Sequence, residues 1–302
     1  MMDNHSHHDH SHSHTSNKKA LFISFILITT FMIVEVIGGF WTNSLALLSD
    51  AGHMLSDAAA LGLSLLAFKI GESSANSNKT FGYRRFEILA AFLNGVTLIA
   101  ISLYIFWEAA NRFVEPPEVA SGGMLVIATL GLFINILVAW ILMRGGDTKN
   151  NLNMRSAFLH VLGDLLGSVG AIAAGLLILF FNWYLADPIA SVLVAILVLI
   201  SGWRVTKDAF HVLMEGKPAS VDIVKVKHEL LSLEGVKDVH DLHVWSITSD
   251  FLSFSCHLVV SDPINRDQLL QEASYILESN HGLKHVTIQI EGDGYVECHP
   301  CY

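Results

Sequence analysis

Six long apolar segments alternate with short polar stretches over the first two thirds of the chain. They cover residues 20–40, 44–68, 86–110, 124–143, 156–181 and 185–205. A helix needs roughly 20 residues to cross the hydrocarbon core of a bilayer, and every segment reaches about that length. The pattern therefore predicts a membrane domain of six transmembrane helices over residues 20–214.

Beyond residue 214 the apolar runs shorten and charged residues return, which marks a second domain over residues 215–302. "VDIVKVKHELLSL" and "NRDQLLQEASYILES" space their apolar residues as helices do, whereas "GVKDVHDLHVWSIT", "FLSFSCHLVV" and "HVTIQIE" are typical of strands. The order αββαβ predicts a ferredoxin-like α/β domain, with helices on one face of an antiparallel sheet. The open face suits a partner, and a second copy of the chain, giving a homodimer, is the simplest candidate.

Residues 1–19 form a polar tract of low complexity. Such a tract cannot bury a core, so it predicts a disordered tail. It also lacks the apolar core of a signal peptide, and we expect no cleavable leader. Spaced imidazoles on a flexible chain favour weak, exchangeable collection of metal ions over a plain linker. The histidines of this tract are His5, His7, His8, His10, His12 and His14.

Composition and charge agree with a protein that lies in the lipid bilayer. Only 15% of the residues are charged and the mean hydropathy is +0.48. The net charge of −10 argues against a nucleic-acid partner.

Lys and Arg are retained in cytoplasmic loops, so their distribution predicts orientation. The loops on the side opposite the N-terminus contain a single cation, Arg112. We therefore expect both termini in the cytoplasm. The protein is expected to be a multi-pass protein of the cell (inner) membrane. The cations on the side of the N-terminus are Lys18, Lys19, Lys69, Lys79, Arg84, Arg85, Arg144, Lys149, Arg155, Arg204 and Lys207.

All three cysteines follow the last span, and on this topology they face a reducing compartment. A structural disulfide is therefore not expected. Cys298 and Cys301 have the Cys-x-x-Cys spacing of two ligands of a tetrahedral metal site, which His299 or a partner subunit could complete. A reduced, flexible terminus is the alternative.

Two spans each contain a histidine followed four residues later by an aspartate, "HMLSD" at 53–57 and "HVLGD" at 160–164. Positions i and i+4 share a helix face, and a rise of about 1.5 Å per residue puts both pairs near the middle of the membrane. A single buried His or Asp can be satisfied by a hydrogen bond between helices. Four at matching depth favour a tetrahedral Zn²⁺ site made of His53, Asp57, His160 and Asp164.

Other polar residues within the spans allow more than one interpretation. Asp50 precedes His53 by one turn and suits either an accessory ligand or a solvated helix end. Glu35 and Asn135 are expected to pack or to form hydrogen bonds.

Several motifs together resemble the cation diffusion facilitator family, in particular its zinc-type branch of bacterial zinc, cadmium and cobalt exporters. They are the duplicated "HxxxD", "FGYRRFEILAAFLNG" at 81–95, "HVLGDLLGSVG" at 160–170 and "VHDLHVW" at 239–245. The resemblance implies a homodimeric antiporter that moves a divalent cation out of the cytosol against protons. It also implies that the four intramembrane residues are the transport site. The loop "GESSANSNKTFGYRR" lacks the His and Asp ligands that some members carry there, so a loop metal site is not expected.

The resemblance further implies a cytoplasmic Zn²⁺ site in the second domain. His240, His257 and Glu291 match its ligands directly, whereas His285 is offset by one residue. Solvated histidines on a polar strand face are the alternative, and His243 is expected to have a structural role. A charge contact between Arg85 and Glu215 is equally open to a functional or a merely solvated interpretation.

Proton coupling has a physical reason of its own, because a ligand must lose its proton to bind metal. Metal and proton then compete for one site, and alternating exposure of that site would couple their fluxes. Two other classes remain open at this point: an uncoupled channel or a metal sensor, and an intramembrane metalloenzyme. The enzyme is disfavoured because no H-E-x-x-H motif occurs in the sequence.

Overall fold

The computed structural model describes residues 11–70, 76–144, 152–248, 251–261 and 263–292, without some of the side chains in the helices. The chain divides into two compact units, which are described separately. The membrane unit combines Met1–Ser73 with Ala90–Thr206, and the C-terminal unit combines Ser74–Leu89 with Lys207–Tyr302.

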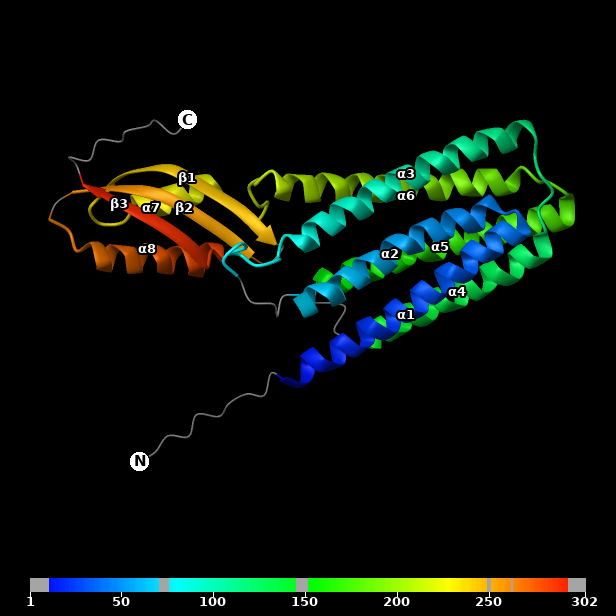
Figure 1. Cartoon of the computed structure of the whole chain (residues 1–302), viewed down its shortest axis with the longest axis horizontal. Coiled ribbons are helices and arrows are strands. Elements are labelled where there is room, and N and C mark those ends of the chain that lie inside the picture. Colours follow the sequence, from blue (N-terminus) through cyan, green and yellow to red (C-terminus); the bar gives the residue numbers. More distant parts are fainter. Residues whose placement is uncertain (1–10, 71–75, 145–151, 249–250, 262, 293–302) are drawn as a thin grey trace, which may run out of the picture. The chain divides into compact units, whose positions relative to one another are not determined.

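Six long helices coincide with the six apolar segments, which confirms the predicted fold class (Figure 1). Among the residues that the structure describes, four stretches are long and apolar enough to cross a bilayer: Phe22–Thr42, Phe86–Val114, Ser121–Val138 and Ala186–Leu213. Their exposed side chains are largely apolar, as expected of surfaces that face lipid. The helices are α1 (Ser11–Thr42), α2 (Leu45–Ile70), α3 (Phe86–Val114), α4 (Ser121–Arg144), α5 (Leu152–Phe181) and α6 (Ala186–Leu213).

Helix α1 begins earlier than the sequence suggested. It starts at Ser11, so the second half of the histidine-rich tract is helical in the structure rather than irregular. Residues 11–19 contain neither Gly nor Pro. Once the apolar part of α1 has formed, adding residues to its end costs little because the helix is already nucleated. The first ten residues lie outside the described part of the chain.

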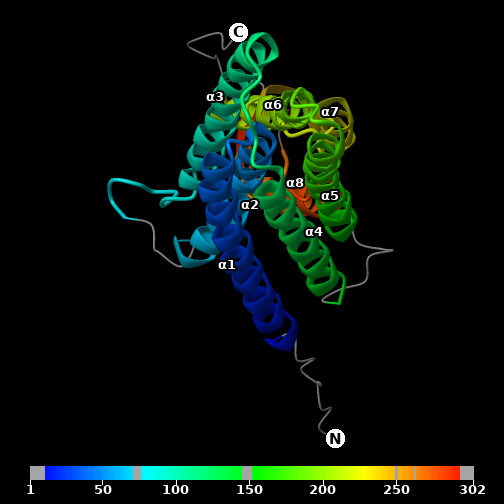
Figure 2. The same ribbon diagram turned by 90° about the vertical axis from the view of Figure 1, so that its right-hand side faces the viewer.

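Helices α1, α2, α4 and α5 share one apolar core, and their bundle is seen from its end in Figure 2. Phe31, Met54, Ile127 and Ala174 meet in that core, one from each helix. Helices α3 and α6 approach closely: a Cβ added to Gly202 would lie 2.9 Å from the Leu98 Cβ. Small residues at such contacts are typical of helix packing in membranes.

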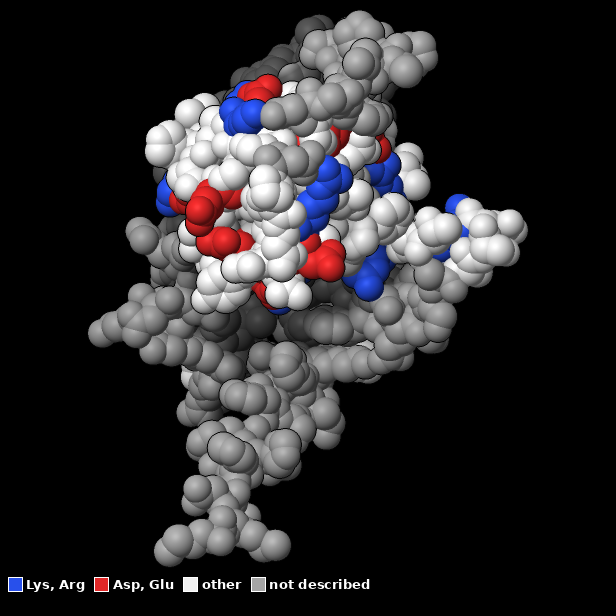
Figure 3. Space-filling model, turned by 90° about the vertical axis from the view of Figure 1, so that its left-hand side faces the viewer, with Lys and Arg blue, Asp and Glu red and all other residues white. Residues whose placement is uncertain are grey.

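The C-terminal unit has the predicted order of elements. It contains α7 (Ile223–Leu231), β1 (Val236–Thr248), β2 (Phe251–Val260), α8 (Arg266–His281) and β3 (His285–Gly292). Both helices share one apolar cluster with Phe254, Leu258 and the other even-numbered residues of β2, so both cover the same face of the sheet. Figure 3 shows acidic and basic side chains interspersed on the described surface of this unit.

The prediction of an antiparallel sheet was wrong in part. In the sheet order β1-β2-β3, β1 and β2 are antiparallel but β2 and β3 are parallel. Helix α8 provides the crossover that a parallel pair requires, because it returns the chain to the end of the sheet where β2 begins. The alternation of polar and apolar residues predicts strands, but it does not give their direction.

Candidate metal centres

Helix α2 carries three ionisable side chains on one face. Asp50, His53 and Asp57 occupy positions i, i+3 and i+7, which lie along the same side of a helix. Asp50 and Asp57 are buried and His53 is partly buried. The partners predicted on α5, His160 and Asp164, lie within that helix, but their side chains fall outside the described part of the structure.

Helix α5 touches α2 at Asp50. The Ser168 hydroxyl donates a hydrogen bond to Asp50 Oδ2 at 3.2 Å. Gly167 lies against the other carboxylate oxygen, so closely that a Cβ at this position would collide with Oδ1. Asn135 of α4 donates to the Ser168 hydroxyl at 3.3 Å, which agrees with the hydrogen-bonding role expected of it. Buried polar contacts therefore hold α2, α4 and α5 together at this level.

A buried aspartate from another helix fixes the first turn of α2. Asp187, at the start of α6, is fully buried and accepts hydrogen bonds from the Ser44 hydroxyl at 2.6 Å and the Leu45 amide at 2.7 Å. It also accepts from the Ala46 amide at 3.2 Å. The amides at a helix N-terminus need such acceptors, and a carboxylate suits the positive end of the helix dipole. Arg112 lies 3.6 Å from the same carboxylate.

A second cluster of metal-ligand type lies in the C-terminal unit, where His240, His257 and Glu291 meet. His257 Nδ1 lies 3.0 Å from Glu291 Oε1, and His240 Nε2 lies 3.5 Å from Glu291 Oε2. One ligand atom of each residue lies within 4.8 Å of the others. The three come from three strands, and His240 pairs directly with His257 across β1 and β2.

The donor set of this cluster fits Zn²⁺. Two imidazoles and one carboxylate provide three of the four ligands of a tetrahedral ion and leave one position open. The Glu291 carboxylate is buried, and a buried carboxylate is costly unless a cation or hydrogen bonds compensate its charge.

Asp241 lies beside this cluster, although the sequence did not indicate it. Its carboxylate accepts a hydrogen bond from His243 Nε2 at 2.8 Å and lies 3.6 Å from His257 Nε2. The hydrogen bond from His243 is the main reason why the pKa of Asp241 is below its usual value, so the carboxylate is ionised near neutral pH. Regular strand alternation would place Asp241 on the opposite face from His240, and an irregularity in β1 brings it here.

The other predicted ligands are not part of this cluster. His285 is six residues before Glu291 on β3, which corresponds to about 20 Å along a strand. Its ring packs 5.6 Å from Phe81 and 5.5 Å from Phe251, measured between centroids. Cys298 and Cys301 lie outside the described residues.

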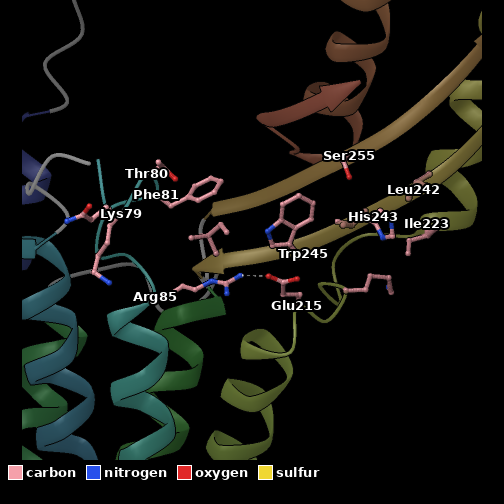
Figure 4. A pocket seen from close by; sticks show the side chains of 15 residues that line it. Lys79, Thr80, Phe81, Arg85, Glu215, Ile223, Leu242, His243, Trp245 and Ser255 are labelled. Carbon is pink, nitrogen blue, oxygen red and sulfur yellow. Dashed lines mark hydrogen bonds and ion pairs between the residues drawn. The ribbon is translucent and has the colours of Figure 1, made fainter. Parts of the chain in front are cut away.

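The C-terminal unit also contains a cavity of about 940 Å³ between the residues before α3 and strand β1 (Figure 4). Phe81 and Trp245 line it, as do Arg85 and Glu215, which form an ion pair at 3.1 Å. The two side chains of the ion pair are 38% and 65% exposed, which makes this a surface contact of small energy.

Comparison with known proteins places these features in a family. The chain matches the family model of the cation efflux transmembrane domain over residues 21–214, and that of the cation efflux protein cytoplasmic domain over residues 218–293. A cadmium, cobalt and zinc/H(+)-K(+) antiporter of Bacillus velezensis is 58% identical, over 96% of this chain and 92% of its own length. The zinc transporter ZitB of Escherichia coli is 45% identical, over 99% of this chain and 94% of its own length.

A solved structure of the metal-bound C-terminal domain of the CzcD transporter from Cupriavidus metallidurans is 38% identical. The match covers 24% of this chain and 99% of the solved CzcD chain, with a TM-score of 0.23.

Proposed function

The chain belongs to the cation efflux family of membrane transporters, and from this premise we propose that it exports Zn²⁺ from the cytosol in exchange for protons. The protein is a metal cation transporter rather than an enzyme. The proposed intramembrane ligands are His53, Asp57, His160 and Asp164.

The contact between Asp50 and Gly167 is the observation that supports this site most directly. Helices α2 and α5 run in opposite directions, so a step toward the C-terminus of one corresponds to a step toward the N-terminus of the other (Figure 1). Because Asp50 lies opposite Gly167, we expect position 53 to lie opposite position 164, and position 57 opposite position 160. Steps of three and seven residues also keep the same helix face. On this expectation each histidine position lies at the level of an aspartate position on the other helix, which supports the proposed site.

Two imidazoles and two carboxylates suit Zn²⁺ in number and type. The same ligands also accept related divalent ions, and the relative from Bacillus velezensis is named for cadmium and cobalt as well as zinc. Zn²⁺ is the preferred assignment because histidine makes up half of the site, whereas a carboxylate-rich site would favour harder cations.

Proton exchange follows from the chemistry of these ligands. His and Asp must be deprotonated to hold the metal, so metal ions and protons compete for the same ligand atoms. A gradient that supplies protons from outside would then release the metal there. The polar contacts of Asp50, Ser168 and Asn135 would keep α2 and α5 together while the site changes its exposure.

Flux through reconstituted vesicles tests the proposal. With an imposed pH difference, the purified chain should move Zn²⁺ in one direction and protons in the other. Asp57→Asn and Asp164→Asn should abolish both fluxes, whereas Asp208→Asn, an exposed aspartate on α6, should transport like the wild type. Transport of wild-type rate by Asp57→Asn would remove the site assignment, and Zn²⁺ flux that ignores the proton gradient would indicate an uncoupled channel.

We propose that His240, His257 and Glu291 bind a regulatory Zn²⁺ ion. We also propose that the protein is a homodimer whose subunits associate through the C-terminal unit. The matched family model describes a cytoplasmic domain, which supports a cytoplasmic location of this unit. The membrane in which we propose that the protein lies is the cell (inner) membrane. His257→Ala should weaken metal-dependent association of the subunits and reduce transport without eliminating it. Complete loss of flux in His257→Ala would contradict this separation of roles.

A further inference from the structure

We propose that Asp241 is a positioning residue for the metal site of the C-terminal unit: it fixes the ring of His257 so that Nδ1 faces the metal. This inference rests on the Zn²⁺ site proposed above for His240, His257 and Glu291. It adds a residue that binds no metal itself and acts through a ligand.

The two nitrogens of His257 face different partners. Nδ1 is buried and lies 3.0 Å from Glu291 Oε1, on the side where the three ligand atoms converge. Nε2 lies 3.6 Å from Asp241 Oδ2. A metal-binding nitrogen must carry a lone pair, so the hydrogen of the neutral ring has to sit on Nε2. The Asp241 carboxylate attracts that N–H and opposes a ring flip that would turn Nε2 toward the metal.

The Asp241 carboxylate is itself held in place. Its other oxygen, Oδ1, accepts the hydrogen bond from His243 Nε2 at 2.8 Å, which leaves Oδ2 directed at His257. His243, expected from the sequence to be structural, thus forms the first step of a chain that runs from His243 through Asp241 to His257. Carboxylates that orient metal-binding histidines in this way commonly change metal affinity by about 10- to 100-fold.

The backbone supports the same conclusion. Asp241 has a φ of +49°, in the left-handed region that is uncommon for residues other than Gly. His240 pairs with His257 and His243 pairs with Ser255, so a step of three residues on β1 matches a step of two residues on β2. Strand β1 therefore contains one extra residue, a β-bulge, at this point. This bulge keeps His240 opposite His257 and still places Asp241 beside the same site. Non-glycine residues in this conformation are often found at functional sites.

The test measures Zn²⁺ affinity of the full-length chain in detergent by competition with a chromophoric chelator. The parent carries Asp57→Asn, so that the proposed transport site does not dominate the signal. Asp241→Asn keeps the shape and the tolerance for positive φ but removes the charge, and it should weaken binding about 10-fold. In a His257→Ala background the same substitution should change the affinity by less than about 2-fold, because the ring through which Asp241 acts is gone.

Two measurements separate positioning from a folding defect. The melting temperature without metal should be unchanged in Asp241→Asn, and Asp241→Gly, which adopts positive φ freely, should weaken Zn²⁺ binding to a similar degree. The proposal would be overturned if Asp241→Asn weakened Zn²⁺ binding equally in the parent and in the His257→Ala background, or if it did not weaken binding in the parent. If His257→Ala removes no bound Zn²⁺ from the parent, the proposed metal site fails as well, and this result is distinguishable from failure of Asp241 alone.

Discussion

Cys256 illustrates at the level of one residue how burial decides chemistry. The side chain is buried in the core between the sheet and its helices, and desolvation raises its pKa to about 12. A thiol reacts as its thiolate, so Cys256 should be inert in the folded chain near pH 8. We expect iodoacetamide to label it only after unfolding, as measured by mass spectrometry of its peptide.

The raised pKa also has a consequence for stability. Above about pH 8.5 the unfolded chain loses this proton while the folded chain keeps it, so stability falls as the pH rises toward the folded pKa. Cys256→Ala lacks this effect and should lose less stability between neutral and alkaline pH. Rapid labelling of folded wild type would show that the thiol is accessible after all.

Residues whose strand neighbours follow from the order of the elements are the ones that the sequence groups correctly. His240, His257 and Glu291 are grouped by the sequence, and the structure brings them together: His240 pairs with His257 across β1 and β2, and Glu291 lies on β3 two residues beyond the partner of His257. Asp241 could not be placed, since one extra residue in β1 reverses the face that alternation assigns to it. His285 is grouped with the others by its likeness to a family position, but the strand register pairs it with Ser253, and its ring packs against Phe251.

The packing of α2 against α5 can be tested with two glycines of one helix. A Cβ at Gly167 would collide with the Asp50 carboxylate, whereas a Cβ at Gly170 would meet no atom within 4 Å. Gly167→Ala should therefore force the helices apart and reduce Zn²⁺ flux at least 10-fold if ligands from both helices bind one ion; errors of 1 Å in such geometry commonly cost about 100-fold. Gly170→Ala, the matched control, should transport normally. Equal rates in the two variants would argue against a site shared by α2 and α5.

The cap that α6 provides for α2 should contribute measurably to stability. Asp187→Ala would leave the Ser44 hydroxyl and the Leu45 amide without their buried acceptor, at about 1 to 3 kcal/mol for each group. We expect a clear fall in the melting temperature of the detergent-solubilised chain. Asp208→Ala, also on α6 but exposed, is the control and should melt like the wild type. The six helices were predictable from hydropathy, but this contact joins residues 142 positions apart and has no local signal.

At the scale of the whole molecule, the contacts of the structure add a segment to the C-terminal unit. Hydropathy predicts a boundary near residue 214, but the structure groups Ser74–Leu89 with the C-terminal unit. That association depends on contacts over long sequence separations, such as Arg85 with Glu215 and the Phe81 ring 6.3 Å from Phe251. Each half of such a contact looks like an ordinary surface residue in the sequence.

Orientation in the membrane is the prediction that concerns the molecule as a whole. Arg112 is the one cation on the side that is predicted to face outward, so it is the exception to the charge rule. Its side chain is buried and donates hydrogen bonds to Glu108 at 2.8 Å and to the Asn43 carbonyl at 2.6 Å. Arg112 has a structural role, so its presence on the predicted outer side does not weaken the charge asymmetry on which the prediction depends. A fluorescent protein that folds only in the cytoplasm should therefore fluoresce when fused to the C-terminus, and a phosphatase active only outside should be active when fused after residue 116. The reverse pattern of activities would invert the proposed direction of transport.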